Sequence, residues 1–280
     1  MFDFFGERLY DILNIALTVW NVISLNVFKL LAVSPTSFKE GGPWKIISEA
    51  EPVFTGVASS LVVLFFVWGF CARGIDVKEE MRFEEILRLL IRLVLADFLV
   101  ANSVTIMKAF FKSIGALVKL IGVGSGRKIS LSETQIETIK SLGLVDGLFM
   151  CLIGLILALI IIGCAFMLLY TVYFRFLKVL VIVPLGAIAC ATLAGSNQVS
   201  HSFLTYVRYF FAVTLEAVAM ALAILVCNAL ISAGFSLDFG DSFLGWMTVL
   251  LYLFEMTFTC VLTVGAVKGS EQLCQKALGL

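Results

Sequence analysis

The first helix-length segment of the chain separates apolar from polar positions with helical periodicity. Over residues 7–31 the apolar positions recur at spacings of three and four, as on one face of an α-helix. The apolar face carries Leu9, Ile12, Leu13, Ala16, Trp20, Ile23, Val27 and Leu30, and the polar face carries Asp11, Asn14, Thr18 and Asn21. This pattern predicts an N-terminal amphipathic helix that either lies at a membrane interface or lines a polar lumen.

Long apolar runs dominate the rest of the chain. They cover residues 52–72, 89–108, 147–170, 203–233 and 244–267. Each run is long enough for a membrane-spanning helix, which needs about 20 predominantly apolar residues. We therefore expect an all-α, polytopic membrane protein with five or six transmembrane spans. The number depends on whether a further apolar stretch, residues 174–196, crosses the membrane.

That further stretch reads FRFLKVLVIVPLGAIACATLAGS. Pro184 removes a backbone donor, so a helix should kink or break there, and broken backbone at membrane depth survives only where protein or a wet cavity covers it. Gly186 and the small residues after it allow close helix contact. The pattern predicts a Pro-broken, protein-buried element, either re-entrant or an ordinary kinked span. Arg175 and Lys178 would anchor it at the membrane interface.

The order of these segments predicts two domains. Residues 1–51 would form the amphipathic helix and a loop on the outer side of the membrane. Residues 52–280 would form the transmembrane helical domain. A hydrophilic loop at about 112–146, with one short helix inside it, would interrupt that domain.

Composition and charge agree with a lipid environment. Hydrophobic residues make up 61% of the chain and the mean hydropathy is +1.06, whereas soluble domains are near 45–50% apolar. Cytoplasmic loops are enriched in Lys and Arg, so the acidic turn with Asp238 and Asp241 is expected outside and the tail with Lys268 inside. Five spans then place the N-terminus outside and the C-terminus in the cytoplasm. The cations of the 112–146 loop favour six spans instead.

The sequence offers little chemistry for catalysis. Seven cysteines form no CxxC pair and mostly lie in apolar runs, His201 is the only histidine, and no nucleophile–base set is visible. The N-terminus lacks the pattern of a removable signal peptide. We expect no enzyme, no cofactor and no metal site.

Charged residues inside the apolar runs are the sharpest candidates for function. They are Asp97, Glu216 and Glu255, with Arg92 and Arg208. Such residues are costly in lipid and usually face a partner or a water-filled cavity. Within one helix Arg208 and Glu216 are two turns apart, so their partners must come from other helices or other subunits. The group would form a polar lining or a proton relay, or serve only as interhelical contacts.

The glycine-rich stretch GVGSGRK at 122–128 lies in the hydrophilic loop. No strand precedes it and the spacing of a phosphate-binding loop is absent. Arg127 and Lys128 would therefore lie in an exposed loop, where they either remain solvated or contact the phosphate backbone of a nucleic acid.

Two segments are similar to a known family. The basic cluster and proline-bearing run at 174–194, followed by the helix HSFLTYVRYFFAVTLEAVAMA at 201–221, resemble the TrbL-like family of channel subunits in type IV secretion and conjugation systems. The order of apolar segments over about 50–270 is also similar, although the central loop here is short.

The resemblance implies a subunit of the inner (cytoplasmic) membrane that passes single-stranded DNA or protein. It also implies self-association into a homo-oligomer, contacts with other secretion-system membrane subunits and with partner ATPases, and transient contact with single-stranded DNA, all within membrane lipid. Two alternatives stay open. One is an ion-coupled secondary transporter or permease that uses the intramembrane acids. The other is a scaffold that only anchors partners.

Overall fold

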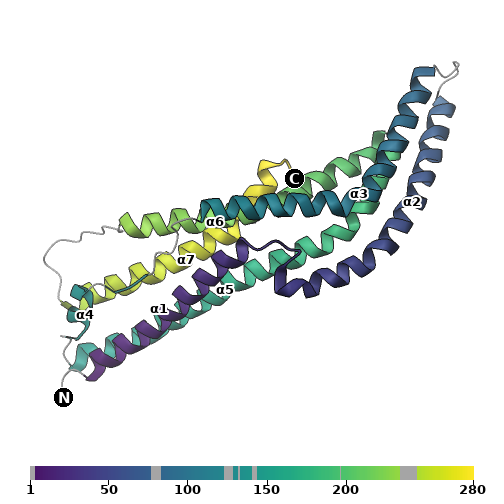
Figure 1. Ribbon diagram of the computed structural model, residues 1–280. Coiled ribbons are helices and arrows are strands. Elements are labelled where there is room, and N and C mark those ends of the chain that lie inside the picture. The colour runs from purple at the N-terminus through teal and green to yellow at the C-terminus, as the bar shows by residue number, and fades with distance from the viewer. Residues whose placement is uncertain are drawn as a thin grey trace. The chain divides into compact units, whose positions relative to one another are not determined.

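The computed structural model describes residues 4–76, 83–122, 129–131, 133–140, 144–195, 197–233 and 245–280. Within these residues the chain is almost entirely helical and contains no strand. The elements are α1 (Phe4–Leu31), η1 (Phe38–Gly41), α2 (Gly42–Asp76), α3 (Phe83–Ile121), α4 (Glu133–Lys140), α5 (Leu144–Ala191), η2 (Thr192–Ala194), α6 (Asn197–Ala233) and α7 (Gly245–Ala277), as Figure 1 shows.

Six stretches of the described residues are helical, long and apolar enough to cross a membrane. They are Gly6–Leu31, Phe38–Cys71, Ile86–Ile121, Asp146–Ala194, Val199–Leu230 and Met247–Ala277. The predicted fold class, an all-α multi-pass membrane protein, is therefore confirmed. The amphipathic N-terminal helix is itself one of the six.

The helices are divided between two compact units. Unit 1 comprises Met1–Leu31, Val118–Tyr173 and Val218–Ser270, and unit 2 comprises Ala32–Leu117, Phe174–Ala217 and Glu271–Leu280. The long helices α5, α6 and α7 each contribute residues to both units. The predicted domain boundary at residue 51 lies inside α2.

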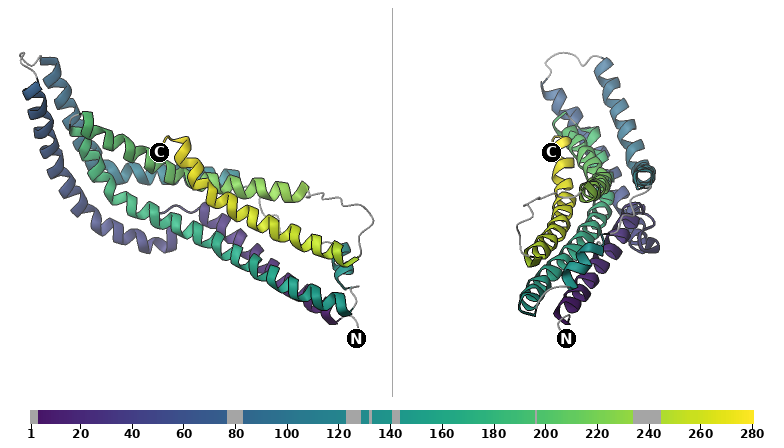
Figure 2. Two further views of the ribbon diagram at one scale, coloured as in Figure 1. Left: turned by 180° about the vertical axis from the view of Figure 1, so that it is seen from behind. Right: turned by 90° about the vertical axis from the view of Figure 1, so that its left-hand side faces the viewer.

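Unit 1 is built on the apolar face of α1. Leu9 and Leu13 are buried there against Met150 and Leu157 of α5 and against Leu253 of α7. Both views in Figure 2 show α1 running beside the first part of α5. The predicted division of α1 into two faces is confirmed, because most of the positions on its predicted apolar face are buried and none is exposed, while Asp11, Asn14 and Thr18 are exposed.

Unit 2 has two apolar clusters. In one, Ala58 of α2 packs with Ala96 of α3 and Ala187 of α5, and these small side chains let the helices approach closely. In the other, Phe111 of α3 and Phe210 of α6 lie with their ring centroids 5.6 Å apart. The helices α2 and α3 run side by side in every view of Figures 1 and 2.

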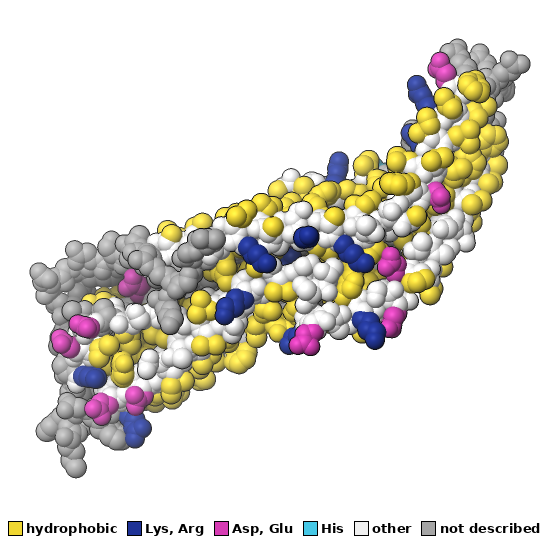
Figure 3. All heavy atoms as spheres, viewed as in Figure 1, with side chains coloured by type: hydrophobic (Ala, Val, Ile, Leu, Met, Phe, Trp, Pro, Cys, Tyr) yellow, Lys and Arg dark blue, Asp and Glu magenta, His cyan; other side chains and the backbone are white. Residues whose placement is uncertain are grey.

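Much of the apolar surface of unit 2 is not covered by the chain itself. Only 17% of the α2 span is buried, compared with 56% of the α6 span. Large side chains such as Trp68 and Val94 are more than half exposed. Figure 3 shows hydrophobic side chains covering α2 and α3 on the face in view. Lipid or other protein must cover this surface, because monomeric soluble proteins rarely expose apolar patches of this extent.

The structure contradicts the predicted break of the helix at Pro184. The two segments expected at 147–170 and 174–196 form a single helix, α5, which continues through Pro184 to Ala191. A proline inside a transmembrane helix is tolerated when neighbouring helices satisfy or cover the disturbed backbone. Pro184 and Gly186 are both buried, as predicted for this element.

Two further helix boundaries differ from the prediction. The helix α2 begins at Gly42 and carries Pro52 inside it, so Pro52 does not open the helix. The helix α3 continues to Ile121, which makes the central hydrophilic region shorter than residues 112–146. The reason is that Phe111, Ile114 and Val118 are buried at helical spacing and extend the apolar face past the first lysines of that region.

Candidate functional site: a buried charge cluster in unit 2

Four charged side chains meet inside unit 2, on segments far apart in the sequence. They are Arg175 and Lys178 of α5, Glu216 of α6 and Glu271 near the end of α7. Their positions follow from local helix geometry, because residues three apart lie on the same face of a helix. Arg175 and Lys178 therefore both point toward the neighbouring helices.

Lys178 is the centre of the cluster. Its Nζ lies 4.0 Å from Oε1 of Glu216 and 2.5 Å from Oε1 of Glu271. The Glu216 side chain is 2% exposed and that of Glu271 is 38% exposed. One ammonium group thus joins α5, α6 and α7, and links a buried carboxylate to one at the surface of the unit.

Arg175 supplies the second positive charge. Its side chain is only 2% exposed, and it interacts electrostatically with Glu216. The guanidinium carbon lies 5.4 Å from the ring centroid of Phe176, which in turn stacks on Phe38 of η1 at 4.1 Å. Arg175 therefore does not face the lipid headgroups as a membrane anchor would, because the chain itself encloses its side chain.

The cluster is balanced in charge but incomplete in hydrogen bonding. Two cations and two carboxylates cancel, which reduces the cost of burying each charge. However, Nε and Nη1 of Arg175 are buried and have no hydrogen-bond partner among the described residues. A buried donor without an acceptor is costly, so these groups are the part of the cluster most able to rearrange or to accept another group.

A second contact fixes α6 against α5 close to Pro184. The Tyr206 hydroxyl donates a hydrogen bond of 2.9 Å to the carbonyl oxygen of Ile182. This contact needs Gly186, because a Cβ atom at that position would collide with Tyr206 and with the end of the Met107 side chain. The hydroxyl thus ties α6 to the backbone of α5 two residues before the proline.

The other charged residues predicted from the sequence do not join this cluster. Asp97 and Arg208 are exposed, and Arg92 and Glu255 are half-buried. Glu255 belongs to unit 1, whereas the cluster belongs to unit 2. Of the predicted group, only Glu216 is brought together with Arg175 and Lys178. The expectation that its partner comes from another helix is confirmed.

The loop cations predicted from the sequence, and one residue that the prediction missed, complete the comparison. Arg127 and Lys128 lie outside the described residues. Glu271 is part of the cluster and was missed, because the apolar run ends near Val267 and the remainder reads as a tail. The signal that could have found it is helical spacing, since α7 continues without interruption to Ala277.

Metal and disulfide chemistry find no support in the part of the chain that the structure describes. No group of three or more His, Cys, Asp or Glu side chains there could hold a metal ion. All seven cysteines are free thiols. Their packing in the helices agrees with their use as small apolar residues.

Comparison with known proteins gives no family assignment. No protein-family model, no curated protein and no solved structure matches the chain. The sequence and the structure together describe a multi-pass helical membrane protein with a buried charge cluster on α5, α6 and α7.

Proposed function

We propose that the chain is a channel subunit of a conjugative type IV secretion complex in the cytoplasmic membrane. In this proposal it helps to pass single-stranded DNA or protein across that membrane. The helix α1 lies at the outer interface and the other five candidate spans cross, so the N-terminus is outside and the C-terminus is in the cytoplasm. Partner ATPases supply the energy, so the subunit itself is not an enzyme and uses no cofactor.

The observation that carries this proposal is the contact between the two segments that resemble the TrbL-like family. The basic, proline-bearing run at 174–194 and the helix at 201–221 are joined by Lys178 with Glu216 and by Ile182 with Tyr206. A sequence pattern whose parts pack against each other is a structural unit rather than a chance succession of apolar residues. This supports the resemblance.

The uncovered apolar surface supports an assembly. The spans of α2 and α3 are only 17% and 28% buried within the chain. Association of helices in lipid depends on close packing and on polar contacts rather than on the hydrophobic effect. We therefore propose that copies of this chain and other membrane subunits of the complex cover part of this surface and lipid covers the rest.

The experiment is deletion of the gene from the conjugative element that encodes it. Transfer of the element to recipient cells should be lost, and expression of the wild-type chain from a second plasmid should restore it. Complementation rules out effects on neighbouring genes. Transfer that continues undiminished without the gene would refute the proposal.

One observation favours a second candidate, an ion-coupled transporter. The cluster places a carboxylate, Glu216, and unsatisfied N–H groups of Arg175 inside candidate spans, where ionisable groups often mark an ion or substrate pathway. Proton-coupled solute uptake by the purified protein in liposomes, lost in Glu216→Gln, would favour this candidate over the channel subunit.

A further inference from the structure

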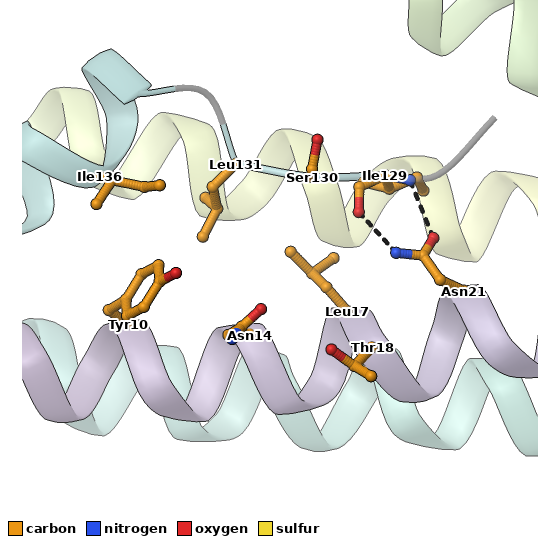
Figure 4. Close-up of a pocket in the computed structure, with 9 residues that line it drawn as sticks. All are labelled: Tyr10, Asn14, Leu17, Thr18, Asn21, Ile129, Ser130, Leu131 and Ile136. Atoms are coloured by element: carbon orange, nitrogen blue, oxygen red, sulfur yellow. Dashed lines mark hydrogen bonds between the residues drawn. The ribbon is translucent and has the colours of Figure 1, made fainter.

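A pocket of about 170 Å³ lies in unit 1, on the polar face of α1. Figure 4 shows Tyr10, Asn14 and Thr18 of α1 on one side, with Ser130 and Leu131 of the segment before α4 on the other. None of the described residues that line it is charged, and the Nζ of Lys140 lies 5.2 Å from the ring centroid of Tyr10, one of the lining residues. The polar stripe that the sequence places on α1 thus faces a hollow.

At one edge of the pocket, α1 already binds a peptide backbone. The side chain of Asn21 donates to the carbonyl oxygen of Ile129 at 2.8 Å and accepts from the N–H of Ile129 at 2.9 Å. Figure 4 shows both bonds closing on one residue of the extended segment. A side-chain amide matches both groups of a peptide residue, because it carries a donor and an acceptor side by side.

Asn14 presents the same group inside the pocket. It precedes Asn21 by seven residues, which is two helical turns or about 10 Å along the same face. Its amide has no hydrogen-bond partner among the described residues, and it is exposed. Ser130 and Leu131 of the extended segment lie across the pocket from it (Figure 4).

The Thr18 hydroxyl is also available. Thr214, Thr257 and Thr263 each donate to the backbone carbonyl four residues earlier, as threonines in helices often do. Thr18 makes no such bond in the described structure, and its side chain lines the pocket. Two neighbouring polar side chains of α1 are thus free to bind a ligand.

The opposite wall offers backbone groups. Within the described residues, no hydrogen bond joins the backbone of Ser130 to another part of the chain. An extended segment with open N–H and C=O groups is a template for pairing with another extended chain. Ser130 is exposed, so such a chain could reach it.

The size and chemistry of the pocket restrict its occupant. A cavity near 150 Å³ encloses a group of about the size of benzene, so this pocket holds one small or apolar side chain with its peptide group. The described lining consists of uncharged groups, which match a peptide backbone better than a phosphate or a carboxylate.

We propose that this pocket binds an extended, uncharged polypeptide segment through its backbone, with Asn14 pairing with one residue as Asn21 pairs with Ile129. The segment lies at the mouth of the pocket, beside Asn14 and Ser130, and one of its side chains enters the pocket. The proposal does not depend on the function proposed above, since it rests only on unit 1.

The test uses the full-length protein in lipid nanodiscs and a capped tripeptide, acetyl-Ile-Ser-Leu-amide, which copies the segment that Asn21 holds. Binding is followed through the side-chain amide signals of ¹⁵N-asparagine-labelled protein. We expect the Asn14 signals to shift in a saturable way. The signals of Asn26, which is exposed on α1 outside the pocket, should stay unchanged.

Two variants and a modified probe sharpen the result. Asn14→Asp keeps the shape but removes the donor, so affinity should fall about tenfold. Asn26→Asp makes the same charge change on the same helix and should have no effect. A probe methylated on its isoleucine nitrogen should bind the wild type more weakly, and Asn14→Ala should abolish that difference. Both sites are exposed, so the variants should fold.

Three outcomes would overturn the proposal. They are no saturable binding of the probe into the millimolar range, equal binding by Asn14→Asp and Asn26→Asp, or equal binding of the methylated and unmethylated probes. Each would show that Asn14 does not recognise a peptide backbone. Loss of DNA transfer on deleting the gene bears on the channel proposal alone, so the two proposals fail separately.

Discussion

At the residue scale, the structure depends on a few polar side chains placed among apolar ones. Lys178 is shared by Glu216 and Glu271, and Tyr206 ties α6 to the backbone of α5 two residues before Pro184. Removing one partner of a buried ion pair is more destabilising than removing both, because the remaining charge is left uncompensated. This asymmetry makes the cluster testable by substitution.

The first prediction concerns Lys178. Lys178→Met should lower the stability of the protein by on the order of 3 kcal/mol, because Glu216 loses its nearest cation in a buried site. Lys178→Met combined with Glu271→Gln should recover part of that loss, because the cluster then keeps one buried cation, Arg175, and one buried carboxylate, Glu216. Thermal unfolding in detergent measures both variants, and Lys119→Met, an exposed lysine of α3, is the control. A double variant as unstable as the single one would contradict the pairing.

The second prediction concerns Gly186. Gly186→Ala should destabilise the protein by about 1–3 kcal/mol, since the added methyl group collides with Met107 and Tyr206. Gly163→Ala is the matched control in the same helix, because a Cβ atom there meets nothing within 4 Å. It should be neutral or slightly stabilising. Equal effects of the two substitutions would show that Gly186 is not a contact point.

At the element scale, periodicity predicted the helices well and their ends poorly. The apolar face of α1 is buried as its spacing indicated, whereas α3 and α5 continue beyond their predicted ends. Pro184 is a strong local signal for a helix end, but Ile182 and Val183 beside it pack against α3 and α6, and α5 continues through it. Those contacts join residues far apart in sequence, so no local pattern could reveal them. Glu271 escaped prediction for another reason, because the apolar run ends before it although the helix continues to Ala277.

The third prediction tests the continuity of α5. Spin labels at Leu177 and Ile188, on either side of Pro184, should lie about 17 Å apart along a continuous helix. Pulsed electron paramagnetic resonance in nanodiscs measures this distance. A re-entrant turn at Pro184 would bring the labels much closer together, and a short distance would restore the break that the sequence suggested.

The fourth prediction concerns the segment that α1 holds. Asn21→Ala should speed hydrogen exchange of the Ile129 amide, because the Asn21 side chain is its acceptor. The substitution Asn26→Ala on the same helix serves as the control and should leave exchange unchanged. Unaltered protection of Ile129 in Asn21→Ala would show that another group holds this segment.

At the scale of the whole molecule, the chain is a membrane protein that covers little of its own apolar surface. The charge cluster holds α5, α6 and α7 together in unit 2, while α2 and α3 present apolar side chains outward. A surface of this kind is expected in a subunit whose apolar side chains are covered by neighbouring subunits in a bilayer. This is the physical basis for proposing a place in a secretion complex rather than an independent enzyme.

The central claim is that this subunit lies on the path of the transferred DNA. The most direct measurement is to crosslink mating cells, isolate the protein by an epitope tag, and quantify the transferring strand bound to it. We predict that this strand is recovered with the protein during transfer and not in cells that lack the partner ATPases. Recovery with other membrane subunits of the same complex, but never with this protein while transfer proceeds normally, would contradict the claim.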